Sequence, residues 1–259
     1  MGRASLTFLG SSSGMPSPAR FCSSLFFQTD RLNFLLDCGE GTSFSLLRNR
    51  IDPLLVDSVF VSHAHVDHVG GLFLLIQTMY LLHRRTPLDV YVPEEAIPGV
   101  RQFLNTCYLF PEKLTFKLSF LPITSGFRFE AQDLSLEAHP NRHLTANERT
   151  LTELKLGNRM QSFSFVLQLP GKKIVYSGDI ESAEDLAEIV TGADILITEC
   201  VHPNLAELLS LMANSDVKSA ILTHIPPELE DKQGEILQKA EKMGIERLSF
   251  SSDGLRVEL

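Results

Sequence analysis

Short apolar runs separated by turn-forming residues dominate the first quarter of the chain. Apolar and β-branched residues concentrate at 6–10, 23–28, 32–37 and 58–62, and each run predicts a β-strand. Thr29 and Asp30 stand between the second and third runs and predict a hairpin turn. The apolar run at 72–83 is longer than a strand, so it predicts a buried helix.

In the second half, strand-like and helix-like runs alternate. Strands are predicted at 172–177, 195–199 and 219–223, and helices at 182–190, 205–213 and 228–243. Ser182 and Asp185 form a capping-box pattern at the first helix, and Gly244 ends the last one. The run at 247–250 is expected to begin a final hairpin. Two sheets packed face to face with helices outside fit this succession of elements.

Composition is that of one compact globular protein. The chain has 259 residues, of which 44% are hydrophobic and 21% charged, and it has no linker, repeat or low-complexity tract. We therefore expect a single domain over residues 1–259. The start has no apolar leader and the longest apolar stretch is too short to span a bilayer, which predicts a cytoplasmic protein without membrane contact. Four cysteines without paired spacing predict reduced thiols: Cys22, Cys38, Cys107 and Cys200.

Three histidines and an aspartate follow the strand at 58–62 within six positions. In an extended segment His63 and His65 project to the same side, while Asp67 and His68 fall in the turn that ends the strand. Imidazole and carboxylate groups at this density are the ligands of zinc or a similar divalent ion. The alternative, that they only cap a strand, would place many desolvated polar groups together without compensation.

Further candidate ligands follow three apolar runs downstream. Asp179 ends the run at 172–177 through Ser-Gly-Asp, His224 ends the run at 219–223, and His143 follows Leu-Glu-Ala-His-Pro-Asn-Arg. Each is placed where loops converge in an α/β scaffold. Five of the eight histidines thus belong to one predicted metal site.

The pattern His63-x-His65-x-Asp67-His68, with the downstream His143, Asp179 and His224, resembles the metallo-β-lactamase superfamily. Stretches at 8–20, 35–48, 175–179, 193–199 and 222–225 are similar to its ribonuclease Z branch. The resemblance implies a four-layer αββα sandwich and two divalent metal ions, zinc or manganese. It assigns His63, His65 and His143 to one ion, Asp67, His68 and His224 to the other, and Asp179 to both. Two such ions activate a shared water for hydrolysis.

The resemblance also suggests roles outside the ligand set. Asp67 would orient or deprotonate the water, and Asp37 would steady the metal-site loop by hydrogen bonding. A histidine that protonates the leaving group, and its partner glutamate, fall on His202 and Glu199; the alternative is a helix-start histidine without a role. In the loop 10–20, Ser11, Ser12, Ser13 and Gly14 would cradle a phosphate.

Other features argue against a tRNA substrate. Residues 162–176 continue without an insertion, so they leave no room for the protruding arm of ribonuclease Z. The formal charge of −9 and pI near 5.4 give no general attraction to nucleic acid. Val66 replaces a glycine common in this branch and should narrow the site. Four basic residues beside and after His143 form either a local basic rim or a solvated loop: Arg142, Arg149, Lys155 and Arg159.

We therefore expect a dinuclear metal-dependent hydrolase, most simply a phosphodiesterase acting on RNA or on a smaller phosphodiester such as a cyclic nucleotide. Two alternatives stay open at this point. One is a hydrolase of lactones, thioesters or sulfate esters on the same metals, and the other is a metal-binding protein without activity. The resemblance also implies a homodimer.

Overall fold

The structure is a computed structural model that describes residues 4–132 and 134–259. The chain forms two compact units, Met1–Ile123 with Ser252–Leu259, and Thr124–Ser251. We call them unit 1 and unit 2 and describe each by itself. Whether both belong to one domain, as the sequence suggests, stays a prediction.

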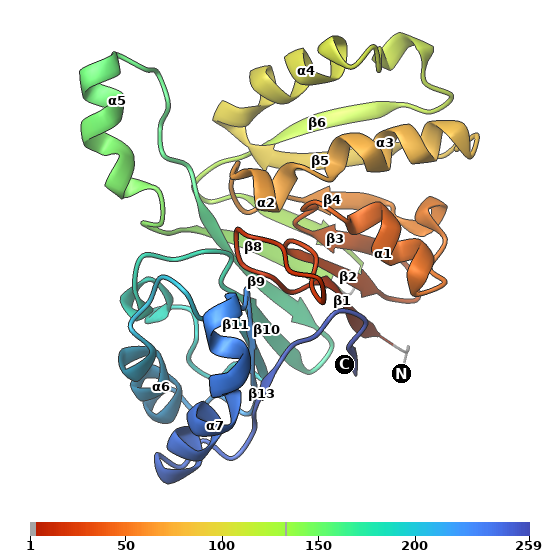
Figure 1. Ribbon diagram of the computed structural model, residues 1–259. Helices are drawn as coiled ribbons and strands as arrows, with labels where there is room; N and C mark the ends of the chain where they lie inside the picture. The colour runs from red at the N-terminus through yellow and green to blue at the C-terminus, as the bar shows by residue number, and fades with distance from the viewer. Residues whose placement is uncertain (1–3, 133) are drawn as a thin grey trace. The chain divides into compact units, whose positions relative to one another are not determined.

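Unit 1 contains a seven-stranded mixed sheet in the order β14-β1-β2-β3-β4-β5-β6 (Figure 1). Neighbours from β14 to β3 are antiparallel, and neighbours from β3 to β6 are parallel. The strands are β1 (Ser5–Gly10), β2 (Ser24–Gln28), β3 (Asn33–Leu36), β4 (Ser58–Phe60), β5 (Leu88–Pro93), β6 (Leu118–Ile123) and β14 (Arg256–Glu258). The predicted hairpin at Thr29 and Asp30 is the connection between β2 and β3.

Helices cover one face of this sheet. They are α1 (Thr42–Arg48), α2 (Val66–Val69), α3 (Leu72–Leu81) and α4 (Ile97–Thr106), with short 3₁₀ turns at Pro53–Leu55, Glu94–Ala96 and Pro111–Lys113. Leu75, Ile76 and Met79 of α3 join Leu35 and Val59 of the strands in one buried cluster. This burial of apolar area is the main stabilising term of the unit.

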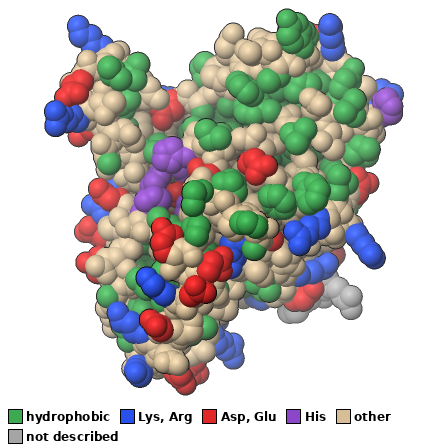
Figure 2. Space-filling view, in the orientation of Figure 1, with side chains coloured by type: hydrophobic (Ala, Val, Ile, Leu, Met, Phe, Trp, Pro, Cys, Tyr) green, Lys and Arg blue, Asp and Glu red, His purple; other side chains and the backbone are tan. Residues whose placement is uncertain are grey.

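The outward side of the same helices is unusually apolar. Phe44 and Leu47 of α1 and Leu74 and Leu81 of α3 are each more than half exposed. Figure 2 shows hydrophobic side chains gathered over these helices. Because α3 carries no charged residue, neither of its faces has the polar character usual for a helix at a surface.

Unit 2 repeats the pattern of unit 1 in a second seven-stranded sheet, in the order β13-β12-β11-β10-β9-β8-β7. Neighbours from β7 to β10 are antiparallel and neighbours from β10 to β13 are parallel. The strands are β7 (Arg128–Ala131), β8 (Leu134–Pro140), β9 (Phe163–Leu169), β10 (Lys172–Tyr176), β11 (Ile195–Glu199), β12 (Ala220–Thr223) and β13 (Leu248–Phe250). Only Pro170 and Gly171 join β9 to β10, so this hairpin has no inserted arm.

Three α-helices accompany this sheet: α5 (Glu148–Leu154), α6 (Leu205–Asn214) and α7 (Gln233–Lys242), with 3₁₀ turns at Thr145–Asn147, Ala183–Leu186 and Pro227–Lys232. Leu208 and Met212 of α6 and Ile236 of α7 pack on Val175 and Leu222 of the strands. Helix α5 buries none of its side chains and stands apart in Figure 1. None of the described helices has both the length and the apolar character needed to cross a bilayer.

Three sequence expectations about these elements are wrong. The helix expected at 182–190 is only the 3₁₀ turn Ala183–Leu186, although the Asp185 carboxylate does accept the Ser182 N–H at 3.4 Å as a capping box requires. The β-branched Ile189 and Val190 then turn into the core, and Gly192 ends the segment at φ 70°. The helix expected at 228–243 begins only at Gln233, after a 3₁₀ turn.

The third wrong expectation is the final hairpin. β13 pairs with β12 in unit 2, whereas β14 pairs with β1 in unit 1, so the last two strands belong to different sheets. The chain leaves unit 2 at Ser251 and continues in unit 1 from Ser252.

Strand direction decides where the functional side chains lie. In unit 1, β1, β3 and β4 run the same way, and in unit 2, β8, β10, β11 and β12 do. Their carboxyl ends therefore share one edge in each sheet. Loops at that edge are where α/β folds place their ligand sites.

Candidate metal centre

In unit 1 the candidate donors follow β4. The strand ends at Phe60, earlier than expected, because the Ser62 N–H donates to a carboxylate instead of a neighbouring strand. His65 precedes helix α2, which carries Asp67 and His68. The His63 ring lies 4.6 Å from that of His65 and 4.1 Å from that of His68, between centroids. The expected closeness of these histidines therefore arises from a turn and a short helix rather than from strand alternation.

Asp37, directly after β3, sets the orientation of two of these rings. Its carboxylate accepts hydrogen bonds from Ser62 N (2.7 Å), Ser62 Oγ (2.9 Å) and His68 Nδ1 (2.8 Å). Since Ser62 gives its hydroxyl proton to Asp37, its oxygen accepts from His63 Nδ1 at 3.0 Å. Both imidazoles are thus protonated at Nδ1, which leaves Nε2 as the basic nitrogen.

This arrangement is the one that metal-ligating histidines require, because a carboxylate or hydroxyl fixes the tautomer from behind. Asp37 is fully buried and has φ 59°, a left-handed conformation that aspartate tolerates better than most residues. Sequence reasoning gave Asp37 such a role but missed Ser62. The signal for it was a hydroxyl residue immediately before the first histidine.

The expected phosphate loop is only partly available. The Ser11 hydroxyl donates to Asp253 Oδ1 at 2.7 Å and the Ser12 hydroxyl donates to Met15 O at 2.8 Å, and both serines are fully buried. Gly14 lies at the loop tip, where an added Cβ would stand 3.6 Å from Asp67 Oδ2. The part of the loop near a candidate metal ligand is therefore its tip, and the serine hydroxyls at its base are used for folding.

In unit 2 the candidate donors surround Asp179. Its Oδ2 lies 3.4 Å from His224 Nε2, 3.7 Å from His143 Nε2 and 3.9 Å from His202 Nδ1. Asp179 and His224 are buried, and His224 has φ 55° just after β12. The Nε2 atoms of His143 and His224 and this carboxylate oxygen form a compact donor set.

Glu199, at the end of β11, connects His202 to this set. Its carboxylate accepts the N–H groups of Ile180 (2.7 Å), Val201 (3.1 Å) and His202 (2.9 Å), and both of its oxygens lie 2.9 Å from His202 Nδ1. A carboxylate accepts in such a contact, so His202 Nδ1 is the donor. His143, Asp179, Glu199 and His202 each place one donor atom within 4.8 Å of the others.

The chemistry of these donors fits a divalent metal such as zinc, which takes imidazole nitrogen and carboxylate oxygen. The cysteines do not belong to the set. Burial, with the nearby Asp67 and Glu40 charges, raises the pKa of Cys22 to about 11, and burial raises the pKa of Cys38 to about 12. Neither thiol is therefore a thiolate at neutral pH, the form in which a cysteine binds metal.

Two basic residues of the expected rim are already paired. Arg142 Nε donates to Asp185 Oδ1 at 2.7 Å and its Nη2 to Glu184 Oε2 at 3.0 Å, and these bonds raise its pKa. Arg149 donates to Glu153 at 2.7 Å. Val66, expected to narrow the site, is 76% exposed. Two of the four basic side chains thus have their charge balanced by neighbouring carboxylates, and the choice between a basic rim and a solvated loop stays open.

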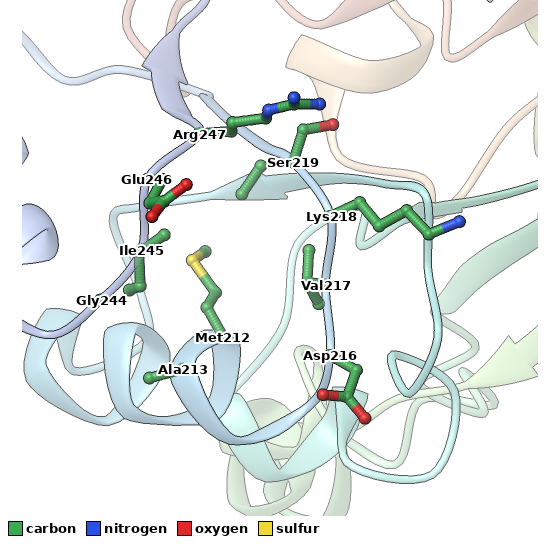
Figure 3. Close-up of a pocket in the computed structure, with 11 residues that line it drawn as sticks. Met212, Ala213, Asp216, Val217, Lys218, Ser219, Gly244, Ile245, Glu246 and Arg247 are labelled. Atoms are coloured by element: carbon green, nitrogen blue, oxygen red, sulfur yellow. The ribbon is translucent and has the colours of Figure 1, made fainter.

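A cavity of about 440 Å³ in unit 2 lies away from these donors. It opens at the amino ends of β12 and β13 (Figure 3). Asp179, Glu199 and His224 instead stand at the carboxyl ends of β10, β11 and β12. Lys218 on its wall is paired with Asp194 at 2.6 Å. The cavity therefore has no part in the candidate chemistry.

Known structures share the fold. The metallo-β-lactamase fold protein YhfI from Bacillus subtilis aligns with a TM-score of 0.78 at 19% identity, over 99% of this chain and all of that one. The short form of human tRNase Z aligns with a TM-score of 0.74 at 19% identity, over 98% of each chain. The molecule is thus an α/β sandwich of the metallo-β-lactamase type, which confirms the expected fold class.

Sequence comparison then gives the family. The chain belongs to the family described as "Anti-Pycsar protein Apyc1", which matches residues 4–247. The chain is also 28% identical to a ribonuclease Z of Methanosarcina mazei, over 98% of its own length and 97% of that protein. The resemblance to ribonuclease Z inferred from the motifs is therefore confirmed.

Proposed function

We propose that the protein is a metal-dependent phosphodiesterase. The observation that carries the proposal is the His202–Glu199 pair beside Asp179, because an ester with a strongly basic leaving oxygen needs a positioned acid. The names of the relatives, ribonuclease Z and tRNase Z, support the same reaction class.

We propose further that the chain holds two divalent ions, zinc or manganese. Metal ions at such a site activate water and stabilise the charge that develops on the attacking and leaving oxygens. Asp67 would orient the attacking water and take its proton, while Asp37 keeps the His68 tautomer. The ligands we assign are His63, His65 and His143 for one ion, Asp67, His68 and His224 for the other, and Asp179 for both.

The protein should bind two metal ions per chain, because seven donors exceed what one tetrahedral zinc takes. Elemental analysis after purification with zinc or manganese measures the ratio. His143→Ala should lower it to one or less, whereas the exposed His83→Ala should leave it at two. A wild-type ratio that never exceeds one would contradict the dinuclear assignment.

A panel of four substrates tests the reaction class: bis-p-nitrophenyl phosphate, a lactone, a thioester and an aryl sulfate. We expect the phosphate diester to be hydrolysed fastest, and hydrolysis to stop on metal removal by a chelator. Preference for another ester would support the alternative hydrolase, and failure on all four would support a metal-binding protein without activity.

Among phosphodiesters, we propose RNA or a small diester such as a cyclic nucleotide rather than tRNA. The short β9–β10 hairpin and the paired Arg142 offer no extended basic grip. The cytoplasmic location and the homodimer also stay predictions. Sedimentation of the purified protein tests the homodimer. We expect the dimer interface to use the apolar outer side of α1 and α3.

A further inference from the structure

Asp253, six residues from the end of the chain, holds together the two ends of the loop between β1 and β2. We call these ends, at Ser11–Ser12 and Phe21, the neck of the loop. Its Oδ1 accepts the Ser11 hydroxyl at 2.7 Å and its Oδ2 accepts the Phe21 N–H at 2.7 Å. The Ser12 N–H donates to Phe21 O at 2.8 Å. The two ends of the loop are thus held side by side by one carboxylate from a segment 232 residues beyond Phe21.

A buried arginine completes the arrangement. Arg20 Nη1 donates to Ser11 Oγ at 2.7 Å, so the serine accepts from Arg20 and passes its own proton toward Asp253. Arg20 is 8% exposed. Charges buried at this depth are costly to keep, and removal of one partner leaves the other uncompensated.

Burial makes the charged form of the Asp253 carboxyl less favourable. Burial raises the pKa of Asp253, and the bonds from Phe21 and Ser11 and the charge of Arg20 only partly oppose that rise. An apolar residue would avoid this desolvation penalty, but it could not hold both ends of the loop. The position therefore serves the loop rather than the stability of the core.

The tip of the loop is what the neck positions. Gly14 faces Asp67, with 3.6 Å between an added Cβ and Asp67 Oδ2. Ser12 Oγ binds Met15 O at 2.8 Å, which fixes the turn between neck and tip. The C-terminal segment is itself anchored, since Gly254 N–H donates to Phe8 O at 2.8 Å on β1.

We propose that Asp253 is a positioning residue, which holds the loop so that Ser13 and Gly14 receive the phosphoryl group of the substrate beside Asp67. This rests on the proposed phosphodiesterase function. Successive backbone N–H groups in a fixed turn can bind an anion, but only if the turn keeps its shape. Asp253 should therefore act on substrate binding more than on the chemical step.

The test compares Asp253→Asn with the exposed control Asp216→Asn. Asparagine keeps the shape but removes the charge that pairs with Arg20. We expect faster amide hydrogen exchange at residues 12–16, and a rise of about tenfold in KM and in the inhibition constant of inorganic phosphate, the size of one lost charge-assisted hydrogen bond. The kcat and the metal content should stay within about twofold of the wild-type values, a change that is small beside a tenfold rise. The control should change none of these.

Each other result overturns the proposal. Unchanged exchange at 12–16 would show that Asp253 does not hold the loop, and faster exchange with unchanged KM and phosphate inhibition would show that the loop does not bind phosphate. A fall in kcat together with metal loss would indicate a general structural part. If Asp253→Asn does not fold, Ser11→Ala breaks the same link and is judged by the same measurements. If the wild type hydrolyses no diester, the proposed phosphodiesterase function is wrong. The role of Asp253 is then still tested by amide hydrogen exchange at residues 12–16 and by calorimetry of inorganic phosphate binding.

Discussion

Replacement of Asp67 by Ala should abolish hydrolysis almost entirely, with a loss in kcat of at least about 10²–10⁴-fold, the contribution of a positioned base. Asp67 stands on α2 with its Oδ2 3.3 Å from His68 Nε2 and the loop tip at Gly14 close by. The substitution removes a metal ligand and the group that orients the water together. Initial rates on bis-p-nitrophenyl phosphate at saturating metal measure the loss, and Asp30→Ala, in the exposed β2–β3 turn, is the control.

Replacement of Asp37 by Asn should cost less and show a different symptom. The amide oxygen can still accept one hydrogen bond, but it no longer stabilises the Nδ1-protonated forms of His68 and, through Ser62, of His63. Loss of such a partner weakens metal binding by about 10–100-fold. Added metal should therefore restore much of the rate in Asp37→Asn and none in Asp67→Ala. Equal and complete loss in both variants, with metal content intact, would contradict these roles.

The candidate ligands could be read from the sequence because each follows its strand directly. A residue placed one to eight positions after a parallel strand lies at the carboxyl edge whatever the exact end of the strand, so errors in strand length do not matter. His63 shows this. Strand β4 ends two residues earlier than expected, yet the His63 ring still lies 4.6 Å from the His65 ring, between centroids.

Features that depend on distant parts of the chain could not be read in this way. Asp253 meets Ser11 across 242 positions, and nothing near Asp253 in the sequence points to the loop after β1. The pairing of β14 with β1 rather than β13 has the same origin, because strand propensity does not say which sheet accepts a strand. The shortened helix at Ala183–Leu186 follows instead from tertiary burial of Ile189 and Val190, which overrides a correct capping signal.

The position of His202 could be read from the sequence, but the orientation of its ring could not. The sequence placed His202 three residues after Glu199 and left its role open. The structure adds the direction of the hydrogen bond: Glu199 holds Nδ1 and is itself fixed by the Ile180 N–H, next to Asp179. A carboxylate behind Nδ1 stabilises the doubly protonated imidazolium, and in that form His202 has a proton on Nε2 to transfer, which is what a general acid needs.

We therefore expect His202→Ala to slow hydrolysis according to the leaving group. A dinucleoside monophosphate has a strongly basic leaving oxygen and should lose about 10²–10⁴-fold in kcat, the usual contribution of a general acid. Bis-p-nitrophenyl phosphate, whose p-nitrophenolate leaves without protonation, should be hydrolysed at nearly the wild-type rate. Glu199→Gln should act in the same direction with a smaller loss, because it keeps an acceptor for the backbone but not the charge behind Nδ1.

A matched control is available in the same unit. His139 has nearly the same side-chain exposure as His202, 37% against 39%, and also stands beside a glutamate, with its Nε2 3.8 Å from Glu137, but it takes no part in the donor set. His139→Ala should leave both rates unchanged. Equal losses on the two diesters in His202→Ala would indicate that His202 binds substrate or supports Asp179, since neither role depends on how basic the leaving oxygen is. No loss on either would remove the general acid, and with it the reason to prefer diesters with basic leaving groups as substrates.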